Sequence, residues 1–155
     1  EEQKGRFLKE LKGATDAAMP LIDVETSTYG NVMEVRLPLE FVFGADASGI
    51  REVSKPFLNR MLSVVAKWKG VVRIDIEAVI STRRPSFSLG PAQRQNTMQI
   101  MQAGTLARYM TARGVNRKTI APAVRADGRN TILFAFTVRD PENSELNLSP
   151  PEQKP

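Results

Sequence analysis

Apolar residues recur at helical spacing in the first part of the chain. Residues 3–18 combine such a stripe with lysine and glutamate side chains, which predicts a short amphipathic helix ended by Pro20. The stripe over residues 49–69 is longer and predicts a helix with one buried side. Pro56 lies inside this window, and a proline fits best in the first turn, so we expect the helix to begin between residues 51 and 54.

A third helix is predicted over residues 93–113, after a loop at residues 81–92 that is rich in proline, glycine and serine. Gly114 gives this helix a C-terminal stop. The residues that we expect to face the core share one side: Ile100, Ala103, Ala107 and Met110.

Five further segments alternate between apolar and polar residues, as strands with one buried face do. They are residues 22–26, 32–37, 71–80, 119–124 and 131–139. The β-branched run at 71–80 predicts a central strand, whereas Pro122 predicts an edge strand or a bulged one because proline cannot donate to a ladder. Turns are expected at residues 29–31 and 127–128.

The elements follow the order helix, strand, strand, helix, strand, helix, strand, strand, which is typical of an α+β fold. We expect a mixed sheet with two main helices on one face, plus the N-terminal helix. The chain then divides into an amphipathic helical linker at residues 1–20, a globular domain at 21–140, and a polar tail at 141–155 that we expect to be disordered.

The composition excludes most catalytic and metal chemistry. The chain has no cysteine and no histidine, so it lacks thiolate nucleophiles, imidazole bases and the common zinc ligands. Asp75 and Glu77 share one strand face, but this spacing most simply describes a solvated face or one covered by lysine and arginine. We therefore predict no catalytic residue, no metal site and no cofactor.

The net charge is +5, but the charged residues are distributed unevenly along the chain. Residues 81–139 hold ten lysines and arginines against Asp127 alone, whereas residues 1–80 hold eleven against twelve acids. A basic half is typical of domains with a polyanionic or acidic partner, although solvated arginines also keep a domain soluble. Nucleic acid is the less favoured partner, because Phe87 and Tyr109 are the main aromatics available for stacking.

No stretch of the sequence approaches the ~20 apolar residues that span a bilayer. The chain begins with Glu1 rather than methionine, which suggests a piece of a longer protein. We expect a membrane anchor upstream of it.

Four segments together resemble the OmpA/MotB family of peptidoglycan-associated domains. Residues 41–62 (FVFGADASGIREVSKPFLNRML) are similar to the family's strand, small-residue loop and Lys-Pro helix, and residues 71–80 match its next strand. Residues 106–115 resemble the end of its second helix, and residues 125–138 resemble its last strand. The resemblance covers about residues 32–139 and implies an OmpA-like two-layer sandwich.

The resemblance also implies a ligand site, at which this sequence departs from the family. The family's strand continues into Gly-His-Thr-Asp, whose aspartate holds the ammonium of diaminopimelate, and an arginine of its next helix binds the carboxylate. Here Ser81 takes the place of the aspartate, and one alignment assigns Gln95 and Gln102 to the helix positions. A second alignment, which starts the helix motif at Ser86, puts Gln93 in the arginine's place.

Both alignments remove the charged pair, so we predict a degenerate peptidoglycan site. The arginines at 83, 84 and 94 offer another route to the ligand's carboxylate, but no acid lies between Ser81 and Asp127 to take the ammonium. The candidate ligand-binding residues are Ser81, Arg83, Arg84, Gln95 and Gln102.

These observations predict a non-catalytic periplasmic domain of an envelope assembly tethered to the inner membrane, such as a flagellar stator-type motor protein. A secretion-system envelope component and a basic-face module for a polyanion are the alternatives. The expected partners are proteins of the envelope complex and a second copy of the chain in a homodimer. Peptidoglycan is expected to bind weakly or not at all.

Overall fold

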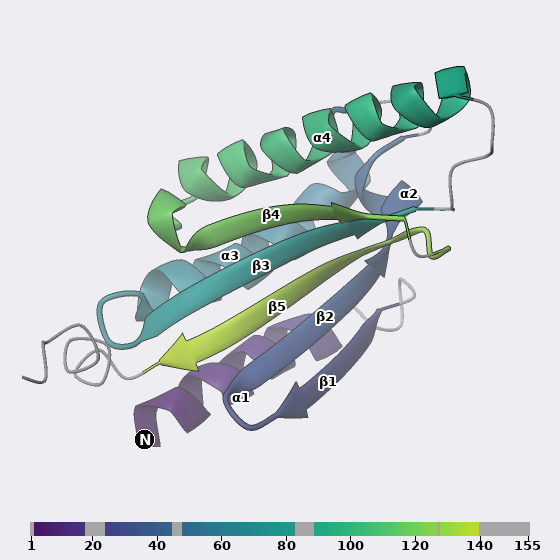
Figure 1. Ribbon diagram of the computed structural model, residues 1–155. Coiled ribbons are helices and arrows are strands. Elements are labelled where there is room, and N and C mark those ends of the chain that lie inside the picture. The colour runs from purple at the N-terminus through teal and green to yellow at the C-terminus, as the bar shows by residue number, and fades with distance from the viewer. Residues whose placement is uncertain (1, 18–23, 45–47, 83–88, 127, 140–155) are drawn as a thin grey trace, which may run out of the picture.

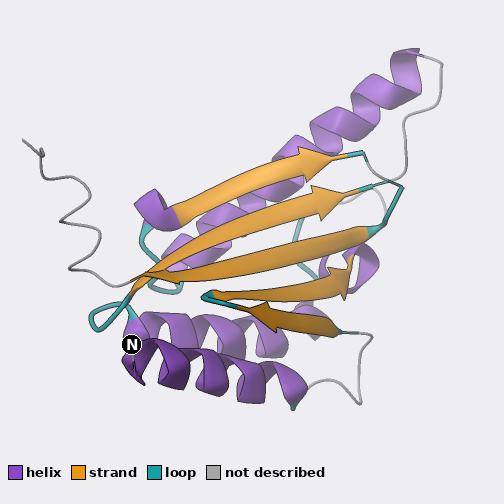
Figure 2. Ribbon diagram, turned by 60° about the horizontal axis from the view of Figure 1, so that its bottom comes forward, coloured by secondary structure: helices purple, strands orange, loops and turns teal. Residues whose placement is uncertain are grey.

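The computed structural model describes residues 2–17, 24–44, 48–82, 89–126 and 128–139, and for residues 89–97 it describes the backbone only. A five-stranded sheet forms one layer, and helices form the second (Figures 1 and 2). The predicted α+β fold with a mixed sheet is confirmed.

The elements follow the predicted order, with three short helical turns added. They are α1 (Glu2–Asp16), β1 (Glu25–Tyr29), β2 (Val32–Pro38), α2 (Leu39–Val42), η1 (Glu52–Ser54), α3 (Lys55–Trp68), β3 (Arg73–Ser81), α4 (Leu89–Ala112), η2 (Arg117–Thr119), β4 (Ile120–Arg125) and β5 (Thr131–Arg139).

The strand order in the sheet is β1-β2-β5-β3-β4. Neighbouring strands are antiparallel except β3 and β4, which are parallel. β4 is therefore an edge strand, as Pro122 predicted. β4 and β5 follow one another in the sequence, but β3 lies between them, so the turn at Gly128 does not join paired strands.

The pleat of the sheet separates an apolar face from a polar one. The apolar face of β2, β5 and β3 is buried against the helices. Its residues are Met33, Val35, Leu37, Ile132, Phe134, Phe136, Val138, Ile74, Ile76, Ala78 and Ile80. Residues between them in the strands, such as Glu34, Asp75 and Glu77, stay partly or fully exposed, except at the end of β3, where Val79 and Ser81 are also buried. The alternation that predicted the strands therefore also predicted which side is buried.

The helix α3 buries an apolar stripe in the same core. The residues of this stripe are Phe57, Leu58, Met61, Leu62, Val64 and Val65. Pro56 lies in the first turn of α3, as predicted, but α3 begins at Lys55, one residue after the predicted window, because the short turn η1 occupies residues 52–54.

The helix α1 packs on the outer side of α3. Phe7 is fully buried and meets the ring of Trp68 edge-on, with 6.4 Å between ring centroids. The indole Nε1 of Trp68 donates a hydrogen bond to Glu10 at 2.8 Å, and Lys67 Nζ lies 3.0 Å from the same carboxylate. α1 therefore contributes to the core of the domain. Whether residues 1–20 also act as a linker stays a prediction.

The helix α4 corrects two of our predictions. It begins at Leu89 rather than near residue 93, because Gly90 and Pro91 are tolerated in a first turn. Ile100, which we expected in the core, is 65% exposed. Among the side chains of α4 that the structure describes, from residue 98 onward, the buried ones are Gln99, Gln102, Ala103, Leu106 and Met110. The face that packs against the sheet is thus turned away from Ile100 and is partly polar.

The predicted end of the first helix at Pro20 and the predicted tail at residues 141–155 lie outside the described residues. Among the described helices, none is both long and apolar enough to cross a membrane.

Candidate functional site

The candidate ligand-binding residues lie around the C-terminal end of β3, where the chain leaves the sheet toward α4. Ser81 is the last residue of β3, and it lies between Thr131 of β5 and Arg125 of β4 in the sheet register. Figure 1 shows this end of the sheet beside the N-terminal half of α4. The fold thus places the β3 end and the glutamines of α4 in neighbouring elements.

A buried hydrogen bond joins these two elements. Gln99 Nε2 of α4 donates to Thr82 Oγ1 at 2.6 Å, and the two residues have exposed fractions of 5% and 6%. The backbone of Thr82 is held as well, since its N–H donates to the carbonyl of Arg125 at 3.0 Å and its carbonyl accepts from Gly128 N at 2.9 Å. Three hydrogen bonds therefore hold Thr82, and its hydroxyl already has a partner within the protein.

Ser81 and Gln102 are buried at the same end, with exposed fractions of 2% and 4%. Ser81 is the last residue of β3, and Thr82 directly follows the strand. α4 meets Thr82, so the structure pairs Thr82 with Gln99 and does not show Ser81 and Gln102 facing one ligand. Their role as ligand-binding residues stays a prediction.

The remaining candidate residues carry less structural information. Arg83 and Arg84 lie outside the described residues. Gln95 belongs to α4, but its side chain is outside the description. Binding of a ligand carboxylate by these arginines therefore also stays a prediction.

The sequence did contain a signal for the buried polar contact. Gln95, Gln99 and Gln102 recur at intervals of four and three residues, which puts them on one side of a helix. We had assigned the core-facing side from the apolar residues alone. Thr82 carried no such signal, because it directly follows a strand and precedes a loop.

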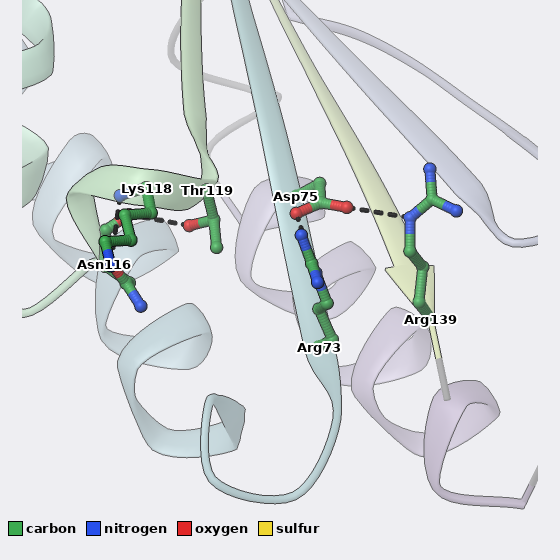
Figure 3. A network of polar contacts seen from close by, with 6 residues as sticks. All are labelled: Arg73, Asp75, Asn116, Lys118, Thr119 and Arg139. Carbon is green, nitrogen blue, oxygen red and sulfur yellow. Dashed lines mark hydrogen bonds and ion pairs between the residues drawn. The ribbon is translucent and has the colours of Figure 1, made fainter. Parts of the chain in front are cut away.

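Charged residues gather at the opposite end of β3 (Figure 3). Asp75 accepts from Arg139 Nε at 2.8 Å and from Arg73 Nε at 3.3 Å. Glu77 lies 3.9 Å from Arg125. Both carboxylates are engaged in ion pairs with arginine and both stay partly or fully exposed, which agrees with the prediction of a face that is solvated or covered by lysine and arginine.

No family model and no curated protein matches the chain. Several solved structures do match it. The cell wall anchor of the T6SS from Pseudomonas aeruginosa matches with a TM-score of 0.66 and 11% identity, covering 84% of this chain and 97% of the other. A MotB-like protein from Desulfovibrio vulgaris matches with a TM-score of 0.62 and 10% identity over 86% of this chain and 94% of the other.

The periplasmic domain of Helicobacter pylori MotB is also similar, with a TM-score of 0.61 and 12% identity over 80% of this chain and 87% of the other. The chain therefore folds as an OmpA/MotB-like domain, and the resemblance seen in its sequence is confirmed for the fold. At these identities, the likeness concerns the fold alone.

Proposed function

We propose that this chain is a non-catalytic domain of the bacterial envelope that acts in the periplasm as part of a membrane-tethered assembly. The fold supports this proposal, because similar structures include a periplasmic MotB domain and a cell wall anchor of the T6SS. A stator-type motor and a secretion system are the two assemblies that these similarities favour. Protein partners and a homodimer follow from the same proposal.

We further propose that the peptidoglycan site of this fold is degenerate here. The observation that carries this proposal is the buried bond between Thr82 and Gln99, which lies beside Ser81 and Gln102, the residues that the resemblance aligns with the family's charged pair. A zwitterionic ligand needs an anion for its ammonium and a forked cation for its carboxylate. Thr82, Gln99, Ser81 and Gln102 are uncharged and buried, so they offer neither.

The expected loss of affinity follows from the difference between neutral and charged hydrogen bonds. A neutral bond contributes about 1 kcal/mol net and a charged one about 1.5 to 3 kcal/mol. Two such replacements remove roughly 1 to 4 kcal/mol, and each 1.4 kcal/mol is about tenfold in affinity. Binding should therefore be weaker by roughly one to three orders of magnitude than at a site with both charges.

Co-sedimentation with purified peptidoglycan tests the proposal. We expect little binding, and the residual binding should fade between low and moderate salt because exposed charges are screened over about 8 to 10 Å. A double variant, Arg83→Ala with Arg84→Ala, measures the contribution of these arginines, and Arg6→Ala with Arg60→Ala removes two exposed arginines elsewhere as a matched control. Tight, salt-resistant binding that only the first double variant abolishes would show that the site is functional.

A second candidate function is a basic-face module for an acidic partner. It is favoured by Arg108, Arg117 and Lys118, which are exposed and have no carboxylate within 4.0 Å among the described residues. Such a module would bind polyanions of unrelated structure with a steep dependence on salt, whereas a peptidoglycan site would discriminate between them.

A further inference from the structure

Four cations are carried by the ends of α3 and α4 and by η2. We call this group the basic corner and define it as Lys69, Arg113, Arg117 and Lys118. Lys69 Nζ donates to the carbonyl of Gly114 at 2.7 Å, which fixes the end of α3 against the end of α4. The guanidinium of Arg113 lies 4.7 Å from the centre of the Tyr109 ring. Contacts within the chain thus hold two of the four cations in place.

The backbone that carries the other two cations is also fixed. Asn116 caps η2, because its Oδ1 accepts from the backbone N–H of Lys118 at 3.0 Å. Its carbonyl accepts from Thr119 Oγ1 at 2.7 Å (Figure 3). Arg117 and Lys118 are therefore presented from an ordered turn, and both side chains are exposed.

The four charges of the basic corner are not neutralised within the described part of the chain. None of them has a carboxylate within 4.0 Å there. In the sequence, no aspartate or glutamate occurs between Glu77 and Asp127. Of the two acids on β3, Asp75 is already shared by Arg73 and Arg139, and Glu77 lies 3.9 Å from Arg125. The corner is thus a local excess of positive charge.

The segment that follows β5 has the opposite charge. Residues 140–155 contain four acids, Asp140, Glu142, Glu145 and Glu152, against Lys154. This segment begins beside the basic corner, because Arg139 pairs with Arg73 at the start of β3 and β4 begins at that same end of the sheet. β5 and β4 are separated by two strand spacings, which is about 10 Å. A segment of sixteen residues can span that distance several times over.

We propose that the acidic segment 140–155 docks on the basic corner of its own chain through charge complementarity and competes there with other anions. The short tether favours this contact, since it gives an effective concentration in the millimolar range. Each exposed ion pair contributes only about 0 to 1 kcal/mol, so the contact opens readily and weakens with salt. This inference stands apart from the proposed envelope function, because it concerns the opposite end of β3 from Thr82.

Zero-length carbodiimide coupling of the full chain tests where the segment docks. Lys118 and Lys69 should couple to Glu142 or Glu145 at low salt, as identified by mass spectrometry, and the products should disappear at high salt. Lys67 and Glu10, which are 3.0 Å apart, are the positive control. Lys55, at the far end of the fourteen-residue α3, is the control for random encounters. Mixing isotope-labelled and unlabelled chains separates coupling within one chain from coupling between two.

The proposal is overturned if the acids of the segment couple to Lys55 as often as to Lys118, or to neither. A binding measurement with inorganic polyphosphate provides an independent check. The double variant Glu142→Gln with Glu145→Gln should bind polyphosphate at least threefold more tightly at low salt. Glu25→Gln with Glu40→Gln changes two exposed acids elsewhere and the net charge equally, so it should have a smaller effect. Equal effects of the two double variants would contradict competition at the basic corner.

Discussion

α3 and α4 contribute to the same core, but they make different kinds of interface. α3 buries an almost uninterrupted apolar stripe. α4 buries Gln99 and Gln102 beside its apolar residues and leaves Ile100 and Met101 exposed. The difference shows that apolar periodicity predicts a buried face only where the interface is apolar. Where polar side chains find partners inside, they determine which face of the helix is buried.

The largest expected effect is the loss of packing under α3. Met61 is 1% exposed and Met101 is 49% exposed, so the same change, methionine to alanine, compares the two helices directly. Met61→Ala should lower the free energy of unfolding by about 2 to 5 kcal/mol through lost burial and a cavity. Met101→Ala should change it by less than about 0.5 kcal/mol. Urea unfolding of both variants measures the difference, and equal losses would contradict the assigned faces.

The next effect concerns the polar contact under α4. Thr82→Val leaves the buried amide of Gln99 without this acceptor, and Gln99→Leu leaves the hydroxyl without this donor. Each single change should cost about 1 to 3 kcal/mol of unfolding free energy, because an unsatisfied buried group loses its full solvation. The double variant should cost less than the sum of the two. Additive losses in this double-mutant cycle would show that the bond does not couple β3 to α4.

A smaller effect is expected at the joint between the two helices. Gly114 has φ of +100°, and a Cβ there would lie 3.4 Å from Ala66 of α3. Gly114→Ala should therefore destabilise the domain by about 1 kcal/mol or more. A Cβ added to Gly13, inside α1, would meet no atom within 4 Å, so Gly13→Ala should stabilise the domain by about 0.5 to 1 kcal/mol. Thermal unfolding of both variants shows whether each change raises or lowers the Tm. A stabilising Gly114→Ala would contradict the assigned backbone conformation.

The smallest effect is a pH dependence where α1 covers α3. The hydrogen bond from Trp68, followed by that from Lys67, lowers the pKa of Glu10 below its ordinary value of 4.5. A lowered folded-state pKa contributes stability that is present above the unfolded pKa and is lost as the pH falls through the folded pKa. Glu10→Gln should thus lower the Tm at neutral pH and have almost no effect in acid well below 4.5. If the difference in Tm between Glu10→Gln and the unmodified domain is the same at both pH values, this explanation is wrong.

Much of the fold could be predicted from the sequence because its signals were local. The alternation in β5 identified both the strand and its buried side, and Pro122 identified β4 as an edge. The placement of β3 between β4 and β5 could not be predicted, because it depends on pairings distant in sequence. The start of α4 was missed because Pro91 is compatible with either a loop or a first turn.

The candidate site could be predicted only in part. The resemblance pointed to the end of β3 and to glutamines of α4, which the fold places in neighbouring elements, and their role as a ligand site stays a prediction. It could not show which hydrogen-bond partners these residues have. That depends on how the end of β3 is positioned against α4, which decides whether Ser81 or Thr82 faces the helix. One residue of shift exchanges the two side chains between faces.

The most direct test of the central claim, that this chain lacks the charged ligand pair and that its β3 end does not bind the ligand, is an NMR titration with a soluble muropeptide that contains diaminopimelate. We predict no saturable shift of the Thr82 backbone amide or of the Gln99 and Gln102 side-chain amides up to about 1 mM ligand, which corresponds to binding weaker than about −4 kcal/mol. Saturable shifts at these residues with a Kd in the micromolar range would show that the β3 end binds the ligand and that the claim is wrong.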